Sequence, residues 1–274
     1  MEEDLKLEPH EKKRVREIQS VNARVIYDAI KRDGESELER PSVDLAFSGL
    51  AAGISLGFSF AVEAFLRRHL PDTEWRFLLV KLGYPIGFLM VIMGRQQLFT
   101  ENTLTPMIPL LDKSSDVTFA GVLRLWVTVF FANVAGAAAF ALAAATTVAF
   151  DPEVRLAMHA ISIEGFHGGQ FGVVLIKAIF AGWLIAMVAW LMPAAETSKI
   201  WVIIILTYVI GIGGFPHVVA GSTSILYSVF DGSLSAASAI THFMLPALIG
   251  NMIGGTLLVA ALNYAQVAAS DEAK

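Results

Sequence analysis

The pattern of hydrophobic positions divides the chain into a polar beginning and a long apolar remainder. From Pro9 to Arg32 the apolar residues recur every three or four positions, among many charged ones. That spacing places them on one face of a helix, and Gly34 is expected to follow its last residue. The segment carries too many charges to cross a bilayer. It predicts an amphipathic helix that lies on the membrane surface or against a neighbouring element.

Six apolar segments follow, each long enough to span a bilayer. They are expected at about 43–65, from Phe77 onward, at about 120–150, at about 171–192, from Trp201 onward, and at about 236–264. A polar connection from Asp151 to Gln170 separates the third from the fourth. Six spans put both chain ends on one side of the membrane, and the basic residues of the N-terminal region place that side in the cytoplasm.

Two of the six segments are interrupted. The second breaks after Gly94, and Thr105 is expected to cap a short helix that restarts at Pro106. The fifth is interrupted between positions 211 and 224 by glycines, a proline and His217. Backbone groups in hydrocarbon must bond to one another, so such a break persists only where it faces a protein-lined cavity. A titratable side chain at that depth indicates a functional site.

The two halves of the apolar region resemble each other. Asn133 and Gly136 form an Asn-x-x-Gly motif in the third segment, and the sixth segment repeats it with Asn251. Thr100 precedes Asn133 by nearly the distance at which His217 precedes Asn251. Three spans per half invert one half relative to the other, so the two breaks meet near the membrane midplane. The predicted fold is an all-α polytopic membrane protein with two inverted three-helix repeats, broken second and fifth helices, and Thr100 facing His217.

The domain boundaries follow from this pattern. We expect a cytoplasmic N-terminal region over 1–40, a six-span channel domain over 41–267 and a cytoplasmic tail over 268–274. Within the channel domain the repeats cover about 43–150 and 171–264.

Composition agrees with a membrane protein and excludes several classes. Of 274 residues, 55% are hydrophobic and 16% charged, none is cysteine, and the mean hydropathy is +0.61. Disulfides and thiolate chemistry are therefore excluded. The chain has no His-Glu-x-x-His, no Gly-x-Ser-x-Gly and no phosphate-binding loop, so no enzyme, metal or cofactor is predicted. No basic stripe supports binding to nucleic acid.

Three motifs resemble those of the formate–nitrite transporter family, whose members carry formate, nitrite, lactate or hydrosulfide. They are Leu98-Phe99-Thr100 at the first break, Gly214-Phe215-Pro216-His217 at the second, and the paired Asn-x-x-Gly motifs. The similarity covers about residues 40–265 and looks greatest to the YfdC-type branch. It implies an aquaporin-like protomer, assembled as a homopentamer in a bacterial inner membrane with one pore per subunit.

The resemblance implies roles for single residues. His217 matches the central pore histidine and Thr100 its hydroxyl partner, while Phe88 and Ile210 fall at apolar constrictions on either side. The remaining expected site residues are Phe99 and Phe215 beside the pore, and Asn133, Asn251, Gly214 and Gly221, which shape the broken helices.

Several positions depart from the family pattern. Gly221 stands in place of an Asn that follows the histidine, and Trp183 aligns with an Asn of the fourth span. The family's vestibule lysine is replaced by His167, and Lys177 is a second candidate for its role or a snorkelling side chain. These changes leave the substrate open.

Other charged and polar residues near the breaks have two readings. Glu101 and Asn102 either gate the cytoplasmic vestibule or tie the loop to Arg95, and a carboxylate facing the pore would repel anions. Glu63 is expected to pair with Arg67 one turn later on the same helix.

The function we expect is a channel for a small monovalent anion or its neutral acid, such as formate or nitrite. A bare anion meets a large desolvation penalty at apolar constrictions and a neutral acid does not, so a proton supplied near His217 would link the two. One alternative is an aquaporin-like pore for water or a small neutral solute. Another is a non-conducting scaffold or sensor, in which Phe88, Ile210 and Trp183 seal the pore. His217 could also be a buried histidine satisfied by Thr100 or a carbonyl.

Overall fold

The regular structure of the chain is helical throughout its described part. The computed structural model describes residues 22–112, 115–166 and 169–272. Its elements are α2 (Ala23–Glu39), α3 (Ser42–His69), α4 (Arg76–Val80), η1 (Lys81–Gly83), α5 (Tyr84–Met93), α6 (Met107–Leu111), α7 (Phe119–Thr146), α8 (Pro152–Gly165), α9 (Phe171–Leu191), η3 (Met192–Ala194), η4 (Glu196–Ser198), α10 (Lys199–Gly213), α11 (Val218–Phe230), α12 (Ala236–Ala239), η5 (Ile240–Met244), α13 (Leu245–Met252), η6 (Ile253–Ala260) and α14 (Ala261–Glu272).

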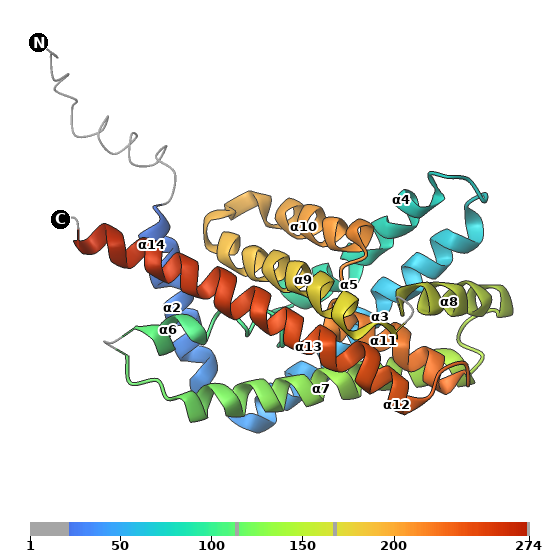
Figure 1. Ribbon diagram of the computed structural model, residues 1–274, viewed down its shortest axis with the longest axis horizontal. Coiled ribbons are helices and arrows are strands. Elements are labelled where there is room, and N and C mark those ends of the chain that lie inside the picture. Colours follow the sequence, from blue (N-terminus) through green and yellow to red (C-terminus); the bar gives the residue numbers. More distant parts are fainter. Residues whose placement is uncertain (1–21, 113–114, 167–168, 273–274) are drawn as a thin grey trace, which may run out of the picture.

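Six helical stretches in the described residues are long and apolar enough to cross a membrane. They are Ser42–His69, Arg76–Met93, Phe119–Thr146, Phe171–Ala194, Glu196–Gly213 and Ala236–Gln266. The predicted number, order and approximate limits of the spans are confirmed. The long helices run along one axis, with α2, α6 and the end of α14 at one end of the bundle and α4 and α8 at the other (Figure 1). Both described chain ends therefore lie at the same end, as an even number of crossings requires.

Small residues let each half of the bundle pack tightly. In the first half, Gly53 of α3 and Gly136 of α7 lie so close to the opposite helix that a Cβ on either would overlap its backbone. In the second half, Gly182 of α9 and Gly254 of η6 repeat this arrangement. Small side chains allow such close packing between membrane helices. The equivalent positions of the two glycine pairs support the predicted internal repeat.

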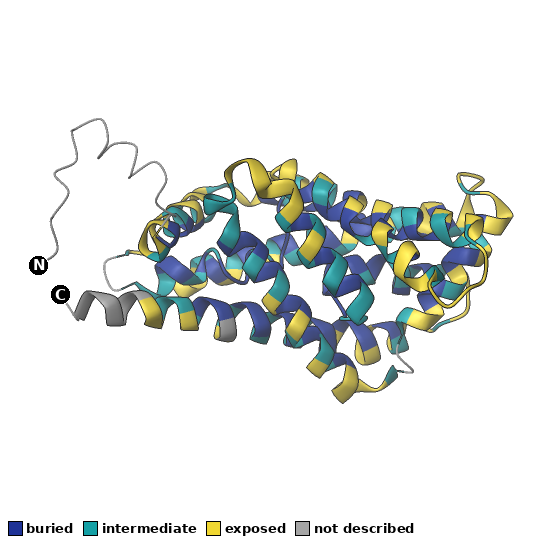
Figure 2. Ribbon diagram, turned by 90° about the horizontal axis from the view of Figure 1, so that it is seen from above, coloured by how far each residue is buried: buried dark blue, intermediate teal, exposed yellow. Residues whose placement is uncertain are grey.

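The flanks of the bundle are apolar and exposed in the isolated chain. Large hydrophobic side chains on the outside include Phe131, Ile176, Trp201 and Leu257, each at least 60% exposed. Figure 2 shows exposed positions alternating with buried ones along the long helices. Trp183 belongs to this outer surface, with 39% exposure, so it does not seal the interior as the scaffold alternative required. An apolar belt of this extent fits lipid or neighbouring subunits.

The N-terminal amphipathic helix packs against the bundle. Ile26, Tyr27 and Ile30 are buried in a hydrophobic cluster with residues of α6 and α9. The helix runs on to Glu39, so its predicted end at Gly34 is wrong; that glycine lies where a Cβ would overlap the Thr105 carbonyl oxygen. Close approach to the first broken loop, not helix termination, explains this glycine. The predicted stretch before Asn22 lies outside the described residues.

One ion pair fastens α2 to the end of α6. Lys31 Nζ lies 2.8 Å from Asp112 Oδ2. This hydrogen bond raises the pKa of the Lys31 ammonium group above its usual value. The Lys31 side chain therefore stays positively charged over the physiological pH range.

One helix was not predicted, and one further local prediction is wrong. The connection from Asp151 to Gln170 contains α8, which packs on α3 and α11 through apolar residues such as Met158. Its apolar residues recur at helical spacing, but the polar average of the segment concealed them. Pro106, not Thr105, precedes the first residue of α6, and the buried Thr105 hydroxyl has no hydrogen-bond partner within the described residues.

Candidate functional site

The two chain breaks meet inside the bundle. Gly94 caps the C-terminal end of α5, and Gly214, whose φ of 55° is left-handed and suits glycine, caps that of α10. Thr100 from the first break and His217 from the second are 0% and 1% exposed. Thr100 Oγ1 lies 2.6 Å from His217 Nε2. The structure thus brings together the two residues that sequence reasoning placed opposite each other.

A single amide side chain holds the first break. Asn133 on α7 accepts a hydrogen bond from the Phe99 N–H at 2.9 Å. Its amide nitrogen donates to the Gln97 and Gly49 carbonyl oxygens, each at 2.8 Å. These bonds satisfy backbone groups that a broken helix leaves without partners. Asn133 therefore shapes the loop and is itself fully buried.

Asn251 repeats this arrangement at the second break. It accepts from the Val218 N–H at 2.8 Å and donates to the Pro216 and Ala178 carbonyl oxygens at 3.0 and 2.8 Å. His217 lies between the two backbone groups, of Pro216 and Val218, that Asn251 binds. Leu98 lies in the same way between the groups of Gln97 and Phe99 that Asn133 binds. The structural counterpart of His217 in the first half is therefore Leu98. Thr100 reaches the histidine from two positions further along its loop.

The histidine ring is held in one tautomer. His217 Nδ1 accepts the Ala220 backbone N–H at 3.1 Å and so caps the N-terminus of α11. A nitrogen that accepts carries no proton in neutral imidazole, so the ring proton lies on Nε2. The Nε2–H group donates to Thr100 Oγ1, whose own hydrogen must point elsewhere. The Thr100 hydroxyl and the Ala220 N–H together give both ring nitrogens of this buried histidine a hydrogen-bond partner.

Apolar side chains close around the pair. The Phe88 ring meets the His217 ring edge to face, with centroids 5.0 Å apart and planes at 80°. Tyr84 lies one turn away, 5.3 Å from Phe88. Leu98 and Ile210, each 1% exposed, lie toward opposite cavities.

Two cavities approach the pair from different sides. The Glu63 cavity, of about 150 Å³, is lined by residues that include Glu63, Lys81, Tyr84, Ile210, Phe215 and His217. The α2 vestibule, of about 990 Å³, is lined by residues that include Arg40, Arg95, Gln97, Leu98, Glu101 and Lys199. No described residue lines both. His217 and Leu98, one from each break, thus line the first and the second cavity respectively.

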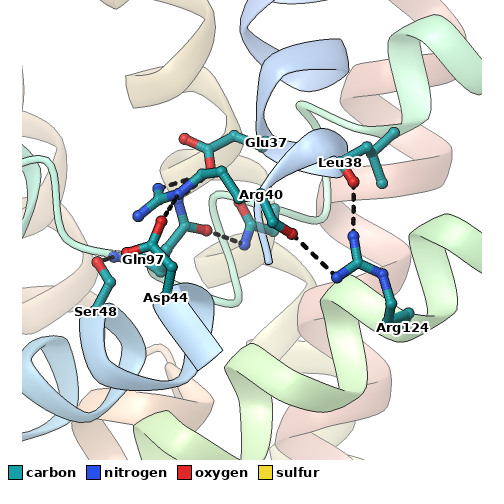
Figure 3. A network of polar contacts seen from close by, with 8 residues as sticks. Glu37, Leu38, Arg40, Asp44, Ser48, Gln97 and Arg124 are labelled. Carbon is teal, nitrogen blue, oxygen red and sulfur yellow. Dashed lines mark hydrogen bonds and ion pairs between the residues drawn. The ribbon is translucent and has the colours of Figure 1, made fainter. Parts of the chain in front are cut away.

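Polar contacts join the end of α2 to the first broken loop (Figure 3). Glu37 accepts from the Gln97 side chain and from Arg40, the latter at 2.9 Å. The Gln97 backbone N–H donates to Ser48 Oγ at 3.0 Å. Arg124 of α7 binds the carbonyl oxygens at the end of α2. The loop that carries Leu98 and Thr100 is therefore bonded to the N-terminal helix, which no local sequence pattern indicates.

The remaining predicted loop residues lie at the vestibule. Asn102 donates to Gln97 Oε1 at 2.9 Å and accepts from the Trp126 ring nitrogen at 2.7 Å through its backbone oxygen. These two bonds connect Asn102 to another residue of the same loop and to α7. Neither bond involves Arg95, the partner that the sequence suggested. Glu101 lines the α2 vestibule beside Arg95.

The predicted aromatic and basic residues have different surroundings. Phe215 stacks on Phe180 with centroids 5.3 Å apart and lines the Glu63 cavity, as Gly221 also does. Phe99 packs against aromatic rings of α7 and lines neither cavity. Lys177 also lines neither, and His167 lies outside the described residues.

Sequence reasoning assigned Glu63 to the wrong partner and missed Lys81. Glu63 Oε2 lies 2.9 Å from Lys81 Nζ, whereas Arg67 forms two hydrogen bonds of 2.7 Å with Glu164. Glu63 faces the bundle interior, and Arg67 reaches a helix beyond it. A lysine inside an apolar span was the available signal for an intramembrane ion pair.

The arrangement defines a class: six-span α-helical membrane proteins whose two inverted repeats oppose broken helices. A family model described as Formate/nitrite transporter matches residues 24–265, and the chain belongs to this family. The resemblance noted from the motifs is thereby confirmed, and so is the aquaporin-like fold that it implied.

Individual proteins and solved structures that resemble this chain support the family assignment. The chain is 38% identical over 271 residues to the inner membrane protein YfdC of Escherichia coli (strain K12), covering 97% of this chain and 87% of that protein. It is 32% identical to the formate channel BtFdhC of Bacillus thuringiensis, covering 81% and 85%. Among solved structures it resembles a pentameric formate channel with formate bound (TM-score 0.71, 20% identity, 82% and 97% covered). An FNT family ion channel gives a TM-score of 0.74 at 19% identity, covering 89% and 98%.

Proposed function

We propose that the protein is a channel for a small monovalent acid of the formate or nitrite type, which crosses between the α2 vestibule and the Glu63 cavity. The observation that carries this proposal is the Nε2–H of His217, bonded to Thr100 between two cavities. A donor buried at such a point binds an acyl or nitrite oxygen after the solute has lost its water. The formate channels among the relatives support this substrate class.

The apolar residues around the pair favour the neutral acid. An anion that passes Phe88, Leu98 and Ile210 loses its hydration without a compensating charge. The N-terminus of α11 adds partial positive potential at His217. We infer that an anion gains a proton near this pair and crosses the apolar residues uncharged. Because Nδ1 accepts the Ala220 N–H, the ring carries one proton, on Nε2, and losing it would leave a buried imidazolate. The proton therefore reaches the anion from water, and the Nε2–H acts as a hydrogen-bond donor that keeps its proton.

The N-terminal region, 1–40, and the tail, 268–274, belong on the cytoplasmic side of a bacterial inner membrane in this proposal, and 41–267 forms the channel. The basic N-terminal region supports the orientation. The apolar flanks support assembly into a homopentamer like that of the structurally similar formate channel.

One alternative has a specific observation in its favour. In the Glu63 cavity, the ammonium group of Lys81 is paired with the Glu63 carboxylate. This cavity therefore lacks the excess positive charge expected at an anion entrance. A pore for water or another neutral solute fits this equally well.

Reconstituted vesicles separate the two functions. Labelled formate uptake is measured between pH 5 and 8 beside water permeability in the same vesicles. We expect uptake to increase as pH falls, since the acid fraction increases, and to collapse in His217→Leu. Rapid water flow with no formate, nitrite, lactate or hydrosulfide uptake at any pH would support the alternative and overturn the proposal.

A further inference from the structure

A carboxylate is buried in the first membrane span with half of its hydrogen-bonding capacity unused. Glu63 is 3% exposed, and its Oε2 binds Lys81 Nζ at 2.9 Å. Its Oε1 is buried and has no hydrogen-bond partner within the described part of the chain. Buried acceptors without partners are rare and costly. An ionisable group in this state inside a membrane span points to a ligand that completes it.

The lysine beside it is also placed for a ligand. Lys81 Nζ lies 5.7 Å from the centroid of the Phe77 ring, and Lys81, like Glu63, lines the same cavity as His217. An ammonium group has three donors, and the contact with Glu63 uses one of them. The cavity of about 150 Å³ has room for a small solute beside the pair, since a water molecule needs only about 10–15 Å³ by this measure.

The charges around this cavity cancel. Glu63 is matched by Lys81, and Glu164, the other acidic residue of its lining, is bonded to Arg67. The remaining titratable side chains in the lining are Tyr84 and the neutral ring of His217. A cavity without excess positive charge does not concentrate anions.

We propose that Glu63 and Lys81 form a binding site for the undissociated acid, and that Glu63 is the residue that selects the acid over its anion. The free Glu63 Oε1 accepts the O–H of the acid, and Lys81 Nζ donates to its carbonyl oxygen. The proton stays on the acid, and no bond is made or broken. A carboxylate anion lacks that O–H and meets a repelling oxygen instead. This inference rests on the proposed channel function and adds its selectivity.

The test is Glu63→Gln, which keeps the shape of the side chain and leaves the Lys81 charge unpaired. We expect formate uptake at pH 7.5 to increase by about tenfold, because one unpaired charge in a narrow entrance concentrates anions. The dependence on low pH should flatten. In Lys81→Met the carbonyl oxygen of the acid loses its donor, so uptake should fall at every pH. A pH profile of Glu63→Gln equal to that of the wild-type protein would overturn the inference.

The matched control is Arg68→Gln, which breaks an ion pair with Glu153 at the end of the same helix, with neither residue lining a cavity. Its uptake should equal that of the wild-type protein. Failure of the channel function looks different, since the wild-type vesicles would then carry neither formate nor its acid.

A second measurement needs only the wild-type protein. Formamide offers an N–H donor and a carbonyl acceptor side by side, as formic acid does, and stays uncharged. It should inhibit formate uptake at pH 5.5, whereas nitrate at equal concentration should not. Absence of inhibition by formamide would overturn the inference even if Glu63→Gln failed to assemble.

Discussion

At the scale of single residues, His217 owes its protonation pattern to the backbone of the helix it caps. The Ala220 N–H fixes a lone pair on Nδ1, so the Nε2–H can only point at Thr100. The same contact ties the chemistry of the ring to the start of α11. Protonating both nitrogens would require this helix to lose its cap, at a cost of about 0.5–2 kcal/mol.

Thr100→Val tests the hydroxyl without changing the size of the side chain. The buried Nε2–H would lose its acceptor, which should lower the free energy of unfolding by about 1–3 kcal/mol and reduce formate uptake. Thr100→Ser keeps the hydroxyl and should retain both. Denaturant unfolding in detergent and vesicle uptake measure the two effects. Equal stability of the valine and serine variants would contradict the assigned hydrogen bond.

Leu98 and Phe99 are adjacent and buried but should behave differently. Leu98 lines the α2 vestibule, whereas the Phe99 ring packs against Phe130 with centroids 5.2 Å apart. Leu98→Ala should widen the path next to His217 and increase water permeability. Phe99→Ala should reduce stability by about 3–5 kcal/mol and leave permeability per folded channel unchanged. Stopped-flow light scattering on vesicles of equal protein content measures the water permeability of both variants. An increase in Phe99→Ala alone would contradict the placement of Leu98 in the vestibule and of Phe99 outside it.

Sequence reasoning could find His217 and Thr100 because a titratable residue at a Gly/Pro break is unusual. It could not find the partner of Glu63. The i,i+4 rule favours Arg67 when both side chains lie on an exposed helix face, but Glu63 points inward, where Lys81 of the next span lies. Only the packing of α3 against η1 decides between the two partners.

At the scale of elements, the two broken helices are held by equivalent amides, and this leads to a symmetric prediction. Asn133→Asp and Asn251→Asp each replace two N–H donors by an oxygen that faces two carbonyl groups. Each should cost about 2–6 kcal/mol, at about 1–3 kcal/mol per abandoned carbonyl. Asn263→Asp on α14 is the control, because its single bond to the Val259 carbonyl is half-buried. Thermal unfolding of the purified variants tests this; a large effect in only one half would contradict the equivalence.

The internal repeat was visible in the sequence because both halves need an amide side chain three residues before a glycine at the same place in the span. α8 was missed because its exposed face is polar and hides the apolar period. The predicted helix end at Gly34 was wrong for a related reason. A glycine in a helix usually marks an end, but here it lets α2 approach the Thr105 carbonyl, and that contact joins segments distant in sequence.

At the scale of the whole molecule, the exposed apolar side chains of the flanks exceed what a monomer in water would tolerate. Lipid and subunit neighbours can both cover them. If the protein assembles as proposed, native mass spectrometry from mild detergent should give a complex of five chains of 29.6 kDa. A monomer or dimer as the main species, with uptake intact, would contradict the proposed homopentamer.

The absence of cysteine makes the membrane orientation directly measurable. Glu39, the last residue of α2, and Glu74, in the turn between α3 and α4, are exposed. The helices α2 and α4 lie at opposite ends of the bundle (Figure 1). Single cysteines at these two positions report the two sides. If the basic N-terminal region sets the orientation, Glu74→Cys should react with a membrane-impermeant maleimide in cells whose inner membrane is intact. Glu39→Cys should react only after that membrane is permeabilised. The reverse labelling pattern would place the α2 vestibule outside and the Glu63 cavity inside, and the acid-selective entrance would then face the cytoplasm.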